Sequence, residues 1–146
     1  MNSVPIEILL VEDNHDEAEL VIRNLKKNNL ANNLRHIDDG VEALDFIFSR
    51  GVYKHRKDFS HPKLILLDLK LPKVSGLEIL QEIKSNEETK TIPVVVLTSS
   101  KEDVDVSEAY RFGVNSYIVK PVNFESFSKA VIDIGMYWMV LNHAKQ

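Results

Sequence analysis

The sequence KLILLD, residues 63–68, holds four consecutive apolar residues between a lysine and an aspartate. A continuous apolar run of this length is typical of a β-strand that is buried on both faces. PVVVL, residues 93–97, repeats the pattern with three valines, which favour strands. Strands covered on both faces are characteristic of parallel sheets, because the crossover helices pack on either side. The two runs therefore predict neighbouring strands of a parallel sheet.

The same alternation continues toward both ends of the chain. Weaker or shorter runs predict three further strands, at Ile6–Val11, Asn33–Asp38 and Asn115–Val119. Stretches with apolar residues at helical spacing separate and follow the strands, at 14–27, 41–50, 75–85, 102–112 and 123–142. This order predicts an α/β fold, a doubly wound five-stranded parallel sheet with helices on both faces.

Several residues indicate where helices begin and end. Asn14 is a good N-cap for the first helix, and Glu17, three residues later, completes a pattern like a capping box. Gly113 is placed to end the fourth helix, and Asn123 to begin the last. The polar, basic stretch Gly51–Pro62 predicts a loop that is either solvated or a contact for an acidic partner.

Composition limits the function classes. The 146 residues, 44% of them apolar, suit a single domain with its core at about residues 6–142 and no attached effector domain. A net charge of −4 is a poor match for nucleic acid or an anionic membrane. The absence of cysteine excludes disulfides and thiolate metal sites. With no signal peptide and no apolar run of membrane-spanning length, we expect a cytoplasmic protein.

Chemically active side chains follow the predicted strands, where open parallel sheets bind ligands. Glu12, Asp13 and Asp68 supply three carboxylates there, and Thr98 and Lys120 add a hydroxyl and an ammonium. Such carboxylates repel one another unless a cation binds between them. A hard divalent ion that prefers oxygen ligands and keeps several waters suits this set, which indicates Mg²⁺. The set suits a phosphoryl group, with one carboxylate as the nucleophile. Taken singly, each residue could simply cap a helix.

In this order the motifs resemble the response-regulator receiver domain of two-component signalling, which includes the chemotaxis regulator, from about Ile6 to Asn142. The resemblance implies a flavodoxin-like receiver fold and phosphorylation of Asp68 by a sensor histidine kinase. It also implies that Asp13, Asp68 and the Lys70 carbonyl bind Mg²⁺ directly and Glu12 through water. The long loop at 51–62 resembles receiver domains that pair with phytochrome-type histidine kinases.

The resemblance further implies roles for the hydroxyl, the lysine and an aromatic residue. Thr98 and Lys120 would contact phosphoryl oxygens, the Lys120-Pro121 bond would often be cis, and Tyr117 would turn inward as Thr98 shifts. Lys70 and Ser100 occupy the two positions that set phosphoryl lifetime in the family. Neither is a carboxylate or amide that orients water, so we expect slow autodephosphorylation.

The last predicted helix is apolar on two sides. One stripe is an ordinary core face. Off that stripe lie four more apolar residues, Ile132, Met136, Met139 and Val140. They predict a second interface, either a homodimer or a partner-docking face, unless they are singly exposed surface residues.

Other function classes lack their own signals. A phosphatase with the same aspartyl chemistry needs an acid two residues after its nucleophile, where Lys70 stands. No glycine-rich phosphate loop indicates a nucleotide or flavin site. The five histidines show no metal-binding spacing, although His15 lies close enough to Asp13 to neighbour the crevice. A scaffold that is never phosphorylated conflicts with the complete acidic, hydroxyl and lysine set. We therefore expect a non-enzymatic, stand-alone response regulator that signals through protein contacts.

Overall fold

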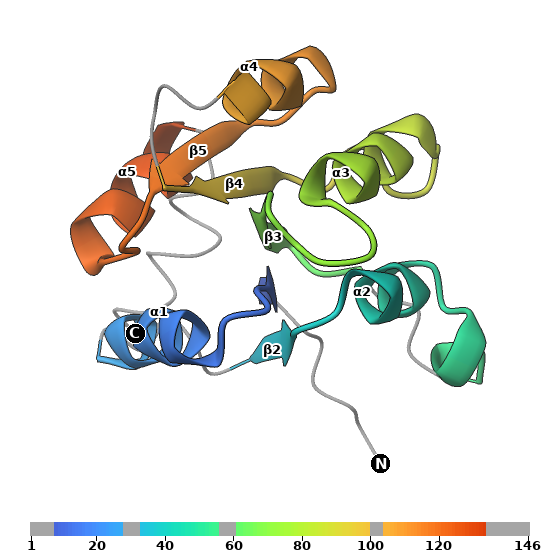
Figure 1. Cartoon of the computed structure of the whole chain (residues 1–146), viewed down its shortest axis with the longest axis horizontal. Helices are drawn as coiled ribbons and strands as arrows, with labels where there is room; N and C mark the ends of the chain where they lie inside the picture. Colours follow the sequence, from blue (N-terminus) through green and yellow to red (C-terminus); the bar gives the residue numbers. More distant parts are fainter. Residues whose placement is uncertain (1–7, 28–32, 56–60, 100–103, 134–146) are drawn as a thin grey trace.

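A computed structural model describes residues 8–27, 33–55, 61–99 and 104–133. These residues form five strands and five α-helices that alternate along the chain (Figure 1). The strands are β1 (Ile8–Val11), β2 (Leu34–Ile37), β3 (Leu64–Asp68), β4 (Val94–Thr98) and β5 (Ser116–Val119). The helices are α1 (His15–Lys26), α2 (Gly40–Ile47), α3 (Gly76–Ser85), α4 (Val104–Arg111) and α5 (Phe124–Asp133).

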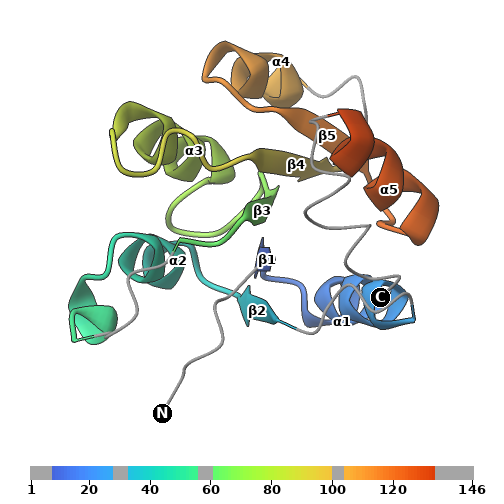
Figure 2. The same cartoon turned by 180° about the vertical axis from the view of Figure 1, so that it is seen from behind.

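All strand pairs are parallel, in the order β2-β1-β3-β4-β5. Helices α1 and α5 cover one face of the sheet, and α2, α3 and α4 cover the other (Figures 1 and 2). The predicted doubly wound fold is therefore confirmed. None of the helices among these residues is long and apolar enough to cross a membrane.

The two faces of the sheet bury alternate residues of each strand. Leu9 and Ile65 pack into the core beneath α2, α3 and α4, whereas Leu10 and Leu66 pack into the core beneath α1 and α5. Every residue of β1, β3 and β4 is buried. This double burial is the physical reason that these strands are apolar throughout rather than alternately polar.

The predicted capping box at the first helix is wrong in one part. The side chain of Asn14 does cap α1, because its Oδ1 accepts the backbone N–H of Glu17 at 2.9 Å. The backbone N–H of Asn14, however, donates to Glu12 Oε2 at 3.2 Å. The Glu17 carboxylate contacts Lys120 instead. Glu17 is therefore available to the functional site rather than used in the cap.

The predicted loop after α2 contains more structure than expected. A 3₁₀ turn, η1 (Gly51–Tyr53), follows α2, and Tyr53 packs its ring edge-on against Phe46. The Tyr53 hydroxyl donates to Glu42 at 2.7 Å and accepts from Arg35 at 2.9 Å. These bonds tie the start of the loop to β2 and α2.

Helix ends largely match the sequence signals. Gly113 adopts φ of +95° just after α4, as a C′ glycine should, and Asn123 Oδ1 accepts the N–H of Ser126 at the start of α5. Part of the predicted last helix lies outside the described residues. The same holds for Ile6, Ser100 and the interface candidates Met136, Met139 and Val140, while Ile132 lies in α5.

Candidate functional site

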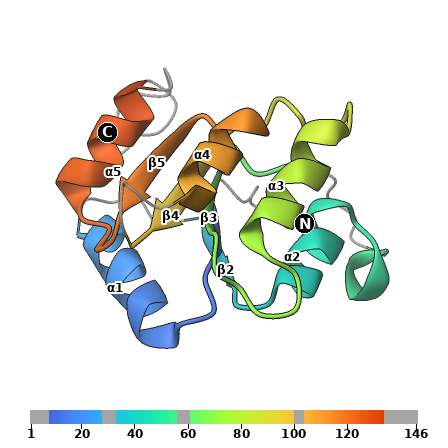
Figure 3. The ribbon, with the colours of Figure 1, turned by 45° about the horizontal axis from the view of Figure 1, so that its top comes forward.

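The predicted site residues meet at the carboxyl edge of the sheet. Glu12 and Asp13 follow β1, Asp68 ends β3, Thr98 ends β4, and Lys120 follows β5. Figure 3 shows β3, β4 and β5, which are neighbours in the sheet, together with α1. A pocket of about 230 Å³ opens there, and all five residues line it. The parallel topology is what brings together residues separated by more than a hundred positions.

Three carboxylates form the acidic part of the pocket. Oxygen atoms of Glu12, Asp13 and Asp68 lie within 4.8 Å of one another. Glu12 is almost completely buried and Asp68 nearly so, whereas Asp13 is exposed. Burial, with hydrogen bonding to Asp68 and repulsion from its charge, raises the pKa of Glu12 to about 8. A cluster this compact is electrostatically unfavourable by itself, and hard oxygen donors of this kind fit a divalent cation.

Lys120 supplies the positive charge of the site. Its Nζ lies 2.7 Å from Glu17 Oε2, 2.9 Å from Glu12 Oε1 and 3.2 Å from Asp68 Oδ2. Burial alone would lower the pKa of Lys120, but the hydrogen bonds to Glu17 and Glu12 and the charge of Asp68 outweigh it and raise that pKa. The ammonium therefore stays charged beside the Asp68 carboxylate.

The backbone fixes these side chains in place. The backbone N–H of Lys120 donates to the Thr98 carbonyl at 2.7 Å, which joins the two strand ends. The backbone N–H of Lys70 donates to Asp68 Oδ1 at 3.2 Å. The Lys120-Pro121 peptide bond is cis. Thr98 is buried and lines the pocket.

Tyr117 lies on β5, toward the helix α4. It is partly buried, and its ring meets that of Tyr110 edge-on with 6.2 Å between centroids. Tyr110 is about half exposed. The predicted switch residue therefore borders the α4–β5 surface, and it pairs with Val96, two residues before Thr98 at the end of β4.

Two residues near the site escaped the sequence prediction. Glu17 lines the pocket from the first turn of α1, and its position in the helix that directly follows the acidic pair is the signal that could have indicated it. His36 contacts the site from β2, with Nε2 2.8 Å from the backbone oxygen of Glu12. His15 does not line the pocket; it is exposed and pairs with Asp38 at 2.8 Å.

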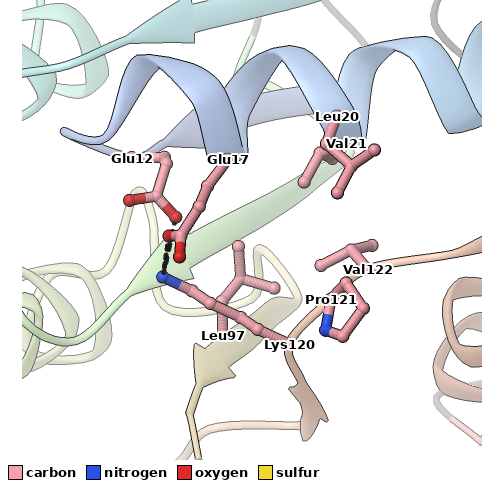
Figure 4. A pocket seen from close by; sticks show the side chains of 8 residues that line it. All are labelled: Glu12, Glu17, Leu20, Val21, Leu97, Lys120, Pro121 and Val122. Carbon is pink, nitrogen blue, oxygen red and sulfur yellow. Dashed lines mark hydrogen bonds and ion pairs between the residues drawn. The ribbon is translucent and has the colours of Figure 1, made fainter.

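A second, more apolar pocket of about 270 Å³ adjoins the acidic one. Figure 4 shows Leu20 and Val21 of α1 facing Pro121 and Val122 across it. Lys120 extends along this pocket, and its ammonium reaches Glu12 and Glu17 at one end. The lysine stem is thus packed against apolar surface while its charge remains in the polar site.

Comparison with known proteins places this geometry in context. The protein family described as "Response regulator receiver domain" matches residues 8–132. The response regulator Rcp1 of Synechocystis is 42% identical over 135 residues, covering 92% of this chain and 90% of Rcp1. Its Mn²⁺-bound crystal structure has a TM-score of 0.72 at 41% identity, covering 91% and 92% of the two chains.

Two other solved structures are also similar. The bacteriophytochrome response regulator AtBRR is 47% identical with a TM-score of 0.85, covering 96% of this chain and 99% of its own. The phosphorylated cyanobacterial phytochrome response regulator RcpA is 36% identical with a TM-score of 0.74, covering 96% of each. Receiver domains bind a divalent metal ion, accept a phosphoryl group on aspartate from histidine kinases and generally signal without enzymatic turnover. The chain belongs to the response-regulator receiver domain family and is similar to the phytochrome response regulators within it.

Proposed function

We propose that Asp68 is the phosphoacceptor of this receiver domain and that Mg²⁺ is its cofactor. The observation that carries the proposal is the position of Asp68, whose Oδ2 lies 3.2 Å from Lys120 Nζ and whose carboxylate lies in the cluster with Glu12 and Asp13. Asp68 is buried at the end of β3, so its carboxylate is held in one place, while the pocket beside it admits a phosphoryl group.

The proposed reaction moves the phosphoryl group from a kinase phosphohistidine to Asp68. A carboxylate oxygen of Asp68 forms the new P–O bond as the P–N bond breaks, and the histidine nitrogen keeps the electron pair and is protonated. Lys120 and Thr98 contact the phosphoryl oxygens and stabilise their charge. Glu12, Asp13, Asp68 and the Lys70 carbonyl would hold Mg²⁺, which neutralises phosphoryl charge when bound.

The change in protein contacts would begin at Thr98 and Tyr117. Both belong to the β4–β5 edge, and Tyr117 borders the α4–β5 surface. We propose that this surface, and a homodimer or docking face on the last helix at Ile132, Met136, Met139 and Val140, carry the output. The net charge of −4 favours protein contacts over nucleic acid or membrane contacts. A cytoplasmic location fits a phosphoryl group that originates from ATP.

Phosphoryl transfer from a radiolabelled sensor kinase tests the assignment. With Mg²⁺ present, we expect base-labile label on the wild type and none on Asp68→Asn. Asp16→Asn is the matched control, since Asp16 is an exposed carboxylate in the first turn of α1 outside the pocket lining. Equal label on the wild type and on Asp68→Asn would show that another residue accepts the phosphoryl group. A wild type that stays unlabelled by kinases and small phosphodonors would instead indicate an unphosphorylated scaffold.

A further inference from the structure

Glu17 makes the shortest contact to Lys120. Its Oε2 lies 2.7 Å from Lys120 Nζ, compared with 2.9 Å for Glu12 and 3.2 Å for Asp68. The contacts with Glu17 and Asp68 are hydrogen bonds, and the contact with Glu12 is an ion pair. A phosphoryl oxygen that binds Lys120 must therefore compete with carboxylates that already neutralise its charge.

Glu17 differs from the other two carboxylates in its place in the site. Glu12 and Asp68 belong to the carboxylate cluster that fits a metal ion, together with Asp13, and Glu17 does not. The Glu17 side chain comes from α1 rather than from a strand end and is about half exposed, at 47%. If Glu12 and Asp68 held a cation, Glu17 would be the carboxylate that neutralises Lys120.

We propose that Glu17 is a positioning residue that competes with the phosphoryl group for Lys120 and so limits the rate of phosphorylation. The inference rests on the proposed role of Asp68. In the unphosphorylated protein, Glu17 draws the ammonium toward α1, on the side of the apolar pocket (Figure 4). Phosphorylation is then slowed because the phosphoryl group has to draw the ammonium away from Glu17.

The size of the effect follows from the exposure of the ion pair. Water partly screens an ion pair that has one half-exposed partner, so Glu17 holds Lys120 only modestly. We therefore expect Glu17→Gln, which keeps the shape of the side chain and removes its charge, to raise the rate of phosphorylation by about 2- to 5-fold. The helix cap remains, because it uses only the backbone N–H of Glu17.

The experiment measures phosphorylation by acetyl phosphate and Mg²⁺ on full-length protein. Asp16→Asn removes the same charge from the same helical turn without touching Lys120, so its rate should stay near that of the wild type. A rate for Glu17→Gln that is unchanged or lower overturns the proposal. An equal rise in Asp16→Asn also overturns it, because the cause would then be general charge removal.

A spectroscopic measurement tests the contact independently of activity. The Lys120 ammonium resonance in NMR spectra should shift in Glu17→Gln and not in Asp16→Asn. An unshifted resonance contradicts the proposed contact. The two proposals fail differently: if Asp68→Asn is still phosphorylated, the acceptor is wrong and this inference falls with it. If Asp68→Asn is inert and Glu17→Gln behaves as wild type, only the role of Glu17 is wrong.

Discussion

Gly76 shows how the absence of a side chain shapes the site. It is buried at the start of α3, and its backbone N–H donates to the Leu69 carbonyl at 2.9 Å. A Cβ at this position would lie 2.6 Å from the Leu69 Cα and still closer to the backbone oxygen of Asp68. The loop after Asp68 can return this close to the strand end only because residue 76 is glycine.

Gly76→Ala should therefore damage both stability and acceptor geometry. Forcing a methyl group against backbone atoms costs about 1–3 kcal/mol, and the atoms that must move are those of Asp68 and its neighbour. Denaturant unfolding and phosphorylation rates measure the two effects. Ser75→Ala is the control: it removes the α3 cap, which accepts from Glu78 N–H, and costs about 1 kcal/mol without altering the acceptor. Normal phosphorylation of Gly76→Ala would contradict this account.

Phosphoryl lifetime also depends on single residues. Lys70, two residues after Asp68, lines the pocket and offers no carboxylate or amide to orient an attacking water. We expect a long-lived phosphoryl group, and we expect Lys70→Asn to shorten its half-life by about 2- to 10-fold, less than a general base contributes, because an amide orients the water without accepting its proton. Loss of radiolabel after kinase removal measures the half-life. A wild-type protein that loses its label as fast as chemotaxis-type regulators would contradict the expectation.

Among the elements, α2 owes its start to one carboxylate. Asp39 Oδ1 accepts the backbone N–H of Val41 at 2.7 Å and of Glu42 at 3.3 Å. The hydrogen bond from Glu42, assisted by that from Val41 and the charge of Lys73, lowers the pKa of Asp39 despite partial desolvation. Because the folded pKa is below the unfolded one, the stabilisation is present above the unfolded pKa and is lost as pH falls through the folded pKa.

Asp39→Ala should lower the free energy of unfolding by about 1 kcal/mol at neutral pH, the usual cost of losing an N-cap. Asp39→Asn keeps a capping oxygen and removes only the charge. Its free energy of unfolding should therefore be lower than that of the wild type above about pH 4, and the two should converge in more acidic solution. Urea denaturation across this pH range measures both variants. A difference between wild type and Asp39→Asn that grows toward acid would contradict the assignment.

The fold elements were predictable where burial is two-sided, and the site was predictable where it sits on strand ends. KLILLD and PVVVL form strands because both faces of the sheet are covered, which leaves an unambiguous apolar run. Asp68 ends such a run and Lys120 follows the weaker strand β5, and the parallel topology brings the two residues to the same edge of the sheet. The prediction missed contacts made across elements: Glu17 was placed in a helix cap, and Tyr53 in a plain loop. Such contacts depend on side-chain directions that local sequence does not specify.

At the scale of the whole molecule, two cores share one sheet. The core beneath α1 and α5 lies on the side of the apolar pocket, and the core beneath α2, α3 and α4 holds the partly buried Tyr117. The acidic site sits at the edge common to both. Thr98 ends β4 and Lys120 follows β5, so both site residues lie at this common edge.

The predicted interface on the last helix is a property of the assembled molecule. If the apolar residues there form a homodimer, the wild type should have twice the chain mass in size-exclusion chromatography with light scattering, and Met136→Glu should be a monomer, because a buried charge without a partner opposes association. A wild type that is monomeric at every concentration would remove the dimer and leave only a partner-docking face.

The most direct test of the central claim identifies the phosphorylated residue chemically. After transfer from a sensor kinase in the presence of Mg²⁺, borohydride reduction cleaves an aspartyl phosphate and leaves homoserine, which mass spectrometry locates in the sequence. We predict homoserine at position 68 alone, and none when a chelator removes the metal during transfer. Homoserine at another position, or undiminished formation without metal, would contradict the assignment of Asp68 and its carboxylate cluster.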